Sequence, residues 1–366
     1  MRPAFSSTKS AAGFTALVLG ILLLPVIIPI AWLPPRASLY STIPWNYGAF
    51  PFIREQIFER KDKLDIAFIG SSRVWFDIDS PYVAHELTHQ MGRSANVVTL
   101  GWSWPGFDAT YCVAADLLGN RKVDLLVIYN EKPVQNMPHP ISAHWFRWAD
   151  DPEAREGLSW PLQAGLYTSG IISLPLSLMG LARANLPLSP ISDTPNFQEK
   201  LYHAPNPATR LGTLSSRLAL NANPDFVELH PPVLSRNQAV QIYSPAMPGA
   251  FRFDQPPMPA FQDHYLRELL AKAHKKGTKV VMLYLPTPEE ARWQVMHLQS
   301  NLQDLAAGPL TVMGIPPAEL FAGISEADFK QLFCDLLHLN ANGQAFYTQV
   351  ITPKLLQVYA DQTHLH

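Results

Sequence analysis

The stretch Asp65-Ile-Ala-Phe-Ile-Gly-Ser-Ser-Arg73 contains an apolar run that stops abruptly at a glycine. Ile66 to Ile69 are typical of a parallel strand that is buried on both faces. Gly70 ends the strand, and two hydroxyls and a guanidinium follow it. Ligands of open α/β sheets bind outside the carboxyl ends of such strands. The simpler interpretation is a strand-to-helix turn in which glycine relieves the backbone and serine caps the next helix.

Apolar strand patterns alternate with helical patterns along most of the chain. The alternating elements are a helix at 80–92, a strand at 95–101, a helix at 108–118, a strand at 123–130, a helix at 263–276, a strand at 279–285, a helix at 288–304, a strand at 310–313 and a helix at 342–359. Three βα units in succession indicate a parallel sheet with helices on both faces. We therefore predict a three-layer α/β/α sandwich around a doubly wound, flavodoxin-like parallel sheet.

The composition is that of a globular protein. The chain has 366 residues, of which 47% are hydrophobic, enough to bury a sizeable core. Its formal net charge is -2, and only 16% of its residues are charged. Such a balance provides no basic surface for a phosphate backbone, so we expect no nucleic-acid partner.

The N-terminus has two features of a membrane anchor. Residues 1–10 include Arg2 and Lys9 but no acid, and residues 11–33 are almost wholly apolar. That length suits a single helix across a bilayer. We predict an uncleaved transmembrane signal anchor at 11–33 after a cytoplasmic N-terminus, with a cleaved signal peptide as the alternative. Because positive charge stays inside, we expect the rest of the chain in the periplasm, tethered to the inner membrane.

The remaining chain divides into three parts. A connector at 34–62 leads into an α/β domain formed by residues 63–133 and 260–366. Residues 134–259 are rich in proline and poor in strand patterns, and we interpret them as a lid-like insertion. The apolar stretch at 162–181 within it is either an internally packed helical pair or a lid that faces a membrane or an acyl chain.

Cys112 and Cys334 are the only cysteines. The predicted extracytoplasmic compartment permits a disulfide between them. Two buried, unpaired thiols are the equally weighted alternative.

Asp335 and His338 form a candidate base near the C-terminus. An aspartate three residues ahead of a histidine can accept the Nδ1 proton, which leaves Nε2 available as a general base. The simpler interpretation is a surface aspartate followed by a histidine at a helix entry.

The order of these motifs resembles the SGNH, or GDSL-type, hydrolase superfamily. In that superfamily a serine, a glycine, an asparagine and an Asp-x-x-His pair occur in this order along one sheet edge. The resemblance implies that Ser72 is the nucleophile and that His338 and Asp335 complete a triad. It also implies an oxyanion hole made by the backbone amides of Ser72 and Gly101 and by the side chain of Asn130.

The sequence departs from the simple hydrolases at two positions. Ser71 stands where they have aspartate, and Glu131 follows Asn130 where they have aspartate. The Gly-Ser-Ser version is similar to a membrane-anchored branch that includes alginate and other exopolysaccharide O-acetylation proteins and the teichoic-acid D-alanylation protein. This likeness implies a serine O-acyltransferase or acyl esterase without a cofactor, acting with acetyl groups on a cell-envelope or exported polysaccharide. It also implies a membrane-bound O-acyltransferase as partner.

Three side chains near these motifs are candidate substrate contacts. Arg73 can bind an anionic sugar, and a structural ion pair is the alternative. Trp102 and Trp104 can stack on a sugar face, and packing beneath the insertion is the alternative.

Two other functions remain open. His85-Glu-Leu-Thr-His89 matches the H-E-x-x-H pattern of zinc metalloproteases, with Glu86 as the general base. Ala95 occupies the slot where a third ligand is expected, and zinc leaves the serine and histidine motifs unexplained, so we predict no metal site. The remaining alternative is a catalytically inactive scaffold or glycan-binding subunit of an envelope polysaccharide machine.

Overall fold

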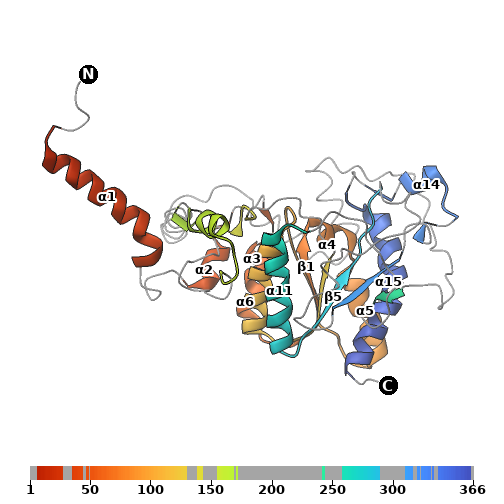
Figure 1. Cartoon of the computed structure of the whole chain (residues 1–366). Coiled ribbons are helices and arrows are strands. Elements are labelled where there is room, and N and C mark those ends of the chain that lie inside the picture. The colour runs from red at the N-terminus through yellow and green to blue at the C-terminus, as the bar shows by residue number, and fades with distance from the viewer. Residues whose placement is uncertain are drawn as a thin grey trace, which may run out of the picture. The chain divides into compact units, whose positions relative to one another are not determined.

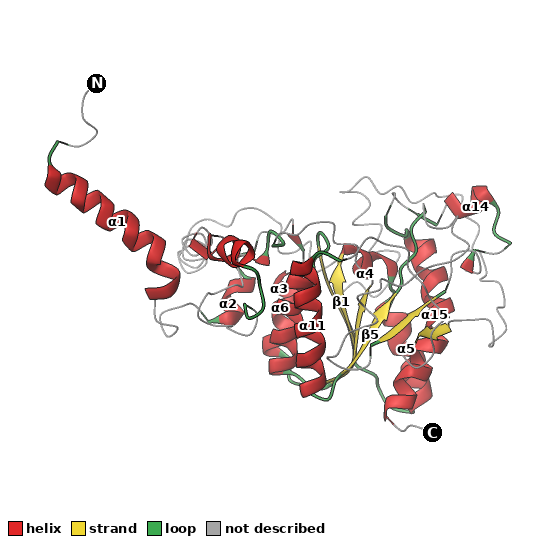
Figure 2. Ribbon diagram, in the orientation of Figure 1, coloured by secondary structure: helices red, strands yellow, loops and turns green. Residues whose placement is uncertain are grey.

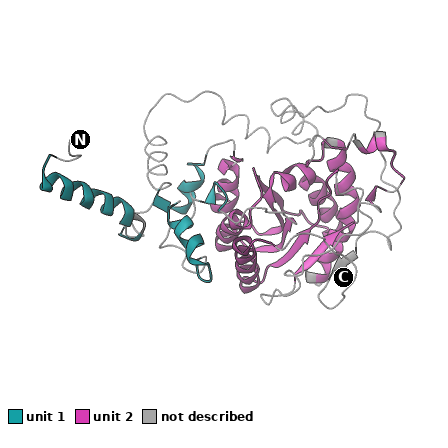
Figure 3. Ribbon diagram, turned by 45° about the horizontal axis from the view of Figure 1, so that its top comes forward, with its two compact units in different colours: residues 1–44, 137–189 teal, residues 45–136, 190–366 magenta. Residues whose placement is uncertain are grey.

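The computed structural model describes residues 6–27, 35–43, 47–48, 50–129, 138–142, 155–168, 170–171, 241–243, 258–288, 310–315, 320–321, 323–330, 332–333 and 337–363. The chain divides into two compact units (Figure 3). One unit comprises residues 1–44 and 137–189, and the other comprises residues 45–136 and 190–366. The second unit contains the entire sheet.

The first unit begins with helix α1 (Thr8–Ile27) and helix α2 (Arg36–Tyr40). Among the described residues, no helix combines the length and the apolar character that a membrane crossing requires. The anchor predicted at 11–33 extends past α1 into residues outside the described part, and it stays a prediction.

The second unit contains a six-stranded sheet, of which five strands are parallel (Figures 1 and 2). Their order across the sheet is β2 (Val97–Trp102), β1 (Leu64–Ser71), β3 (Val123–Tyr129), β5 (Lys279–Leu283) and β6 (Thr311–Gly314). The chain moves outward from β1 to β2 and then crosses back to β3. The carboxyl ends of β1 and β3 therefore flank the point where the strand order reverses, which is where ligands of such sheets bind.

Helices cover both faces of this sheet. Helices α6 (Phe107–Asn120) and α11 (Ala260–Lys275) pack together on one face (Figure 1). The opposite face carries α4 (Ser72–Asp77), α5 (Ser80–Met91) and α15 (Ala341–Thr363). All eight residues of β1 are buried, because both faces of this strand are covered. The predicted three-layer parallel α/β architecture is confirmed at this level.

Two helices of this unit are followed by a glycine with left-handed backbone geometry. Gly92 follows α5 with φ of 64°, and Gly277 lies just beyond α11 with φ of 70°. Glycine adopts this left-handed conformation without the steric cost that a side chain brings. The helix predicted at 288–304 lies outside the described residues, apart from its first position.

A short strand inside the predicted insertion corrects the interpretation of residues 134–259 as a lid alone. Strand β4 (Gln241–Tyr243) pairs antiparallel with β6 at the edge of the sheet. At three residues it is too short to produce an alternating sequence pattern. Most of the insertion, including most of 162–181, lies outside the described residues.

The predicted connector at 34–62 is also divided differently. Helix α3 (Phe50–Arg54) and the π-helical turn η3 (Glu55–Glu59) belong to the unit that contains the sheet. Their side chains at Phe50, Ile53 and Ile57 are fully buried. The second half of the connector is therefore part of the α/β core, because its apolar residues pack there.

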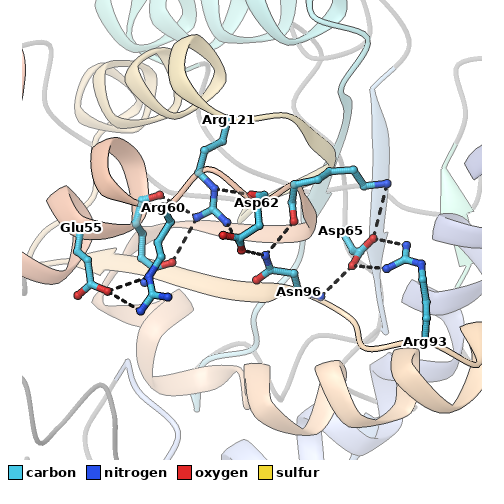
Figure 4. Close-up of polar contacts among 9 residues, drawn as sticks. Glu55, Arg60, Asp62, Asp65, Arg93, Asn96 and Arg121 are labelled. Carbon is cyan, nitrogen blue, oxygen red and sulfur yellow. Dashed lines mark hydrogen bonds and ion pairs between the residues drawn. The ribbon is translucent and has the colours of Figure 1, made fainter.

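A polar network fastens the amino-terminal edge of the sheet (Figure 4). The Asp65 carboxylate accepts hydrogen bonds from the Arg93 guanidinium at 2.7 and 3.2 Å and from the backbone N–H of Asn96 at 2.8 Å. The Tyr359 hydroxyl of α15 donates to the same carboxylate at 2.8 Å. Burial opposes ionisation of Asp65, but these hydrogen bonds outweigh it and lower its pKa. Asp65 thus joins β1, the start of β2 and the last helix.

Candidate active site

Ser72 and His338 lie within hydrogen-bond distance of each other. The Oγ atom of Ser72 is 2.8 Å from Nε2 of His338. Ser72 is the first residue of α4, directly beyond the carboxyl end of β1. His338 lies in the loop before α15, and its ring centroid is 5.0 Å from that of Phe76. The separation is the one that a serine nucleophile and its general base require.

The turn that presents Ser72 is fixed by its neighbours. Ser71 accepts a hydrogen bond from the backbone N–H of Arg73 at 3.4 Å and so caps α4. The Ser71 hydroxyl is also 2.6 Å from the Tyr129 hydroxyl at the end of β3. A Cβ atom at Gly70 would lie 2.8 Å from both Tyr129 and Val74, so this close approach requires glycine. Ser71 therefore supports the turn, and Ser72 projects from it.

Gly101 lies beside this turn on the neighbouring strand. The parallel register pairs Gly101 of β2 with Gly70 of β1. A Cβ atom at Gly101 would lie 2.6 Å from Cβ of Trp75 on α4, so glycine lets that helix pack onto the strand. Packing alone explains the residue type, and the role of the Gly101 amide as an oxyanion donor stays a prediction.

Two of the predicted site residues lie outside the described residues. Asn130 follows the last residue of β3 in the sequence, and Asp335 precedes His338 by three positions. Their predicted roles, as oxyanion donor and as the acid of the triad, stay predictions.

A buried carboxylate that the sequence analysis missed lies on α4. Asp77 is completely buried, and its Oδ1 accepts a hydrogen bond from the backbone N–H of Leu339 at 2.8 Å. Its Oδ2 is 3.4 Å from Nη2 of Arg73. Burial raises the pKa of Asp77 to about 6, although the charges of Arg73 and His338 and the Leu339 hydrogen bond act to lower it. The signal available in the sequence was an acid inside the apolar segment 74–78.

Arg73 is held by protein groups. Its Nη2 donates to the backbone carbonyls of Leu285 at 2.8 Å and Pro286 at 2.6 Å, just past β5. The residue is 9% exposed, and its guanidinium lies 5.9 Å from the centroid of the Tyr129 ring. This geometry favours the structural alternative over binding of an anionic sugar.

The two tryptophans after Gly101 differ. The Trp102 side chain is fully buried, which favours packing, the alternative to sugar stacking, for this residue. Trp104 is 52% exposed, and its ring packs edge-on against Tyr47 at a centroid distance of 5.3 Å. Its φ of 67° is unusual for a bulky residue, and such strain is often found at binding sites.

The H-E-x-x-H motif lies on the exposed side of α5. The His85 and His89 rings are 4.8 Å apart, and Nδ1 of His85 is 3.0 Å from Oε1 of Glu86. Within the described part of the chain, no group of three or more His, Cys, Asp or Glu side chains is arranged to hold a metal ion. His85 and His89 therefore lie side by side on the surface of α5, next to the Glu86 carboxylate.

Cys112 is buried in α6, and Cys334 lies outside the described residues. The disulfide and the two unpaired thiols therefore both stay predictions.

Comparison with models of known protein families and with curated protein sequences finds no match to this chain.

Proposed function

We propose that the chain is a serine-dependent acyl esterase or O-acyltransferase of SGNH type. The observation that supports this most strongly is the 2.8 Å separation between Ser72 Oγ and His338 Nε2. The position of the pair supports it as well, because Ser72 follows the strand next to the point where the strand order reverses. A serine and a histidine in this relation form the core of a nucleophilic catalytic site.

The reaction proceeds through a serine ester. His338 Nε2 accepts the Ser72 proton while Oγ attacks the acyl carbonyl, and the resulting tetrahedral oxyanion accepts hydrogen bonds from backbone amides. His338 then gives the proton to the departing oxygen as the bond from the acyl carbon to that oxygen breaks. A second hydroxyl, from water or from a sugar, loses its proton to His338 and attacks the ester. Ser72 leaves with that proton, so each group returns to its starting state.

A glycan acceptor and an acetyl donor are the finer part of this proposal. They follow from the resemblance to membrane-anchored polysaccharide O-acetylation proteins, together with the predicted anchor and the predicted acyltransferase partner. The half-exposed indole of Trp104 also supports a sugar, since aromatic faces stack on apolar sugar faces. The parallel register places Trp102 beside Ser71, so Trp104 follows β2 at the same edge of the sheet as Ser72.

Covalent labelling by a fluorophosphonate probe tests the proposed function. We expect the folded full-length protein to form one adduct, which mass spectrometry assigns to Ser72. Ser72→Ala should abolish labelling and His338→Gln should slow it greatly, whereas Ser71→Ala should keep the adduct because the neighbouring hydroxyl only supports the turn. A folded protein that forms no adduct would instead favour the inactive scaffold or glycan-binding subunit.

A further inference from the structure

The first and last residues of helix α4 both contact the loop that carries His338. Its first residue, Ser72, faces Nε2 of His338 at 2.8 Å, and its last residue, Asp77, binds the backbone N–H of Leu339 at 2.8 Å. The His338 segment is therefore held against one short helix at two points. Since Leu339 is the residue next to the base, the Asp77 carboxylate holds the backbone beside the imidazole.

The charge of Asp77 also acts on His338. The carboxylate is fully buried, and its interaction with His338 favours the ionised acid. When His338 accepts the serine proton its ring becomes positively charged, and a buried negative charge close to the loop attracts that charge. Among the described residues, Arg73 on α4 and Tyr347 on α15 also interact electrostatically with Asp77.

We propose that Asp77 is a positioning residue for His338, fixing the loop through the Leu339 amide and stabilising the imidazolium ion through its buried negative charge. This inference rests on the proposed serine chemistry. It assigns to Asp77 part of the work that the superfamily resemblance gives to Asp335 alone. Arg73 holds the Asp77 carboxylate in place, because its guanidinium is fixed in turn by the carbonyls of Leu285 and Pro286.

The substitution Asp77→Asn separates the two parts of the inference. An asparagine side chain keeps an oxygen that accepts from Leu339 N–H, but it removes the negative charge. A purely structural acceptor would leave the protonation of His338 unchanged in this variant. A charged positioning residue would make the imidazolium ion harder to form.

Two measurements on the full-length protein test this. The first follows the ring of His338 by NMR with ¹³Cε1-labelled histidine, assigned by the signal lost in His338→Gln. We expect Asp77→Asn to move the titration midpoint of that ring to lower pH by about one unit, the size typical of a nearby opposite charge. The second measures the rate of fluorophosphonate labelling against pH, whose acid limb should move in the same direction.

Asp79→Asn is the matched control, because it removes the charge of an aspartate two residues along the chain whose side chain accepts from Tyr82 N–H at the start of α5. It should weaken that helix cap and leave the His338 midpoint where it is in the wild-type protein. If Asp77→Asn does not fold, as judged by circular dichroism, Asp77→Ser replaces it, since a hydroxyl can also accept from Leu339 N–H.

An unchanged His338 midpoint in the folded Asp77 variant would overturn the inference while leaving the serine mechanism intact. Failure of the wild-type protein to label would contradict the proposed function instead. The NMR titration would then still decide whether the Asp77 charge acts on His338, because it requires no reaction.

Discussion

Oγ of Ser72 lies 2.8 Å from Nε2 of His338, although 266 residues separate the two in the sequence. This relationship predicts that the two side chains act as one unit. Ser72→Ala and His338→Gln should each reduce hydrolysis of an activated acyl ester by roughly 1,000-fold or more, and the double variant should lose little beyond either single one. Steady-state kinetics with p-nitrophenyl acetate measure this. Independent, multiplicative losses would show that the pair does not cooperate.

Gly101 should tolerate no side chain. In Gly101→Ala the added Cβ would lie 2.6 Å from Cβ of Trp75, so we expect the free energy of unfolding to fall by about 1–3 kcal/mol. Urea denaturation measures the loss. Gly119→Ala in α6 is the control, because a Cβ there meets nothing within 4 Å and improves helix propensity. Equal stability of both variants would contradict the packing argument.

The hydrogen bonds to Asp65 should stabilise the fold more at neutral pH than at acid pH. Hydrogen bonds from Arg93, Asn96 and Tyr359 lower the pKa of Asp65 despite its burial, so the folded state binds this proton less tightly than the unfolded chain does. The resulting stability is present above the unfolded pKa and is lost as pH falls through the folded pKa. Arg93→Gln should cost about 1 kcal/mol at pH 7, since the arginine side chain is half exposed, and less at pH 3. Denaturation midpoints at the two pH values measure this, and an equal cost at both would contradict it.

Asp77 should have the opposite effect on stability. Burial raises its pKa from 3.8 to about 6, so the folded state binds this proton more tightly than the unfolded chain. Its contribution to stability is therefore fully present below pH 4 and falls by a few kcal/mol as pH rises through about 6. The difference in free energy of unfolding between the wild-type protein and Asp77→Asn should follow this curve. A difference that does not change with pH would contradict the assigned pKa shift.

The histidine pair on α5 should have no role in the reaction. We expect the purified protein to contain no stoichiometric zinc, and His85→Ala to keep the labelling rate of Ser72 unchanged, because both histidine side chains are on the exposed side of the helix. Elemental analysis and fluorophosphonate labelling provide the two readings. Stoichiometric zinc that disappears in His85→Ala would instead revive the metalloprotease alternative.

Local sequence patterns were enough to predict most of the sheet and its helices. The apolar run at 66–69 predicts a doubly covered strand because burial on both faces leaves no polar alternation. Gly92 and Gly277 mark helix ends because the left-handed backbone there favours a residue without Cβ. Strand β4 escaped prediction, since its three residues acquire strand structure only from their pairing with β6.

By itself, the sequence determined the strand-forming segments and the approximate limits of the long helices, because these depend on local hydrophobicity and backbone preference. The choice of Ser72 and His338 as candidates came from the order of the motifs and the superfamily that this order resembles. Only the tertiary structure decided that Ser72 meets His338, that Trp102 is buried while Trp104 is exposed, and that Asp77 binds Leu339. The physical reason is that a periodic pattern reports whether a side chain is buried but not which distant group it meets. Those partners are fixed only when the parallel strands pair and α4 packs between the sheet and the last helix.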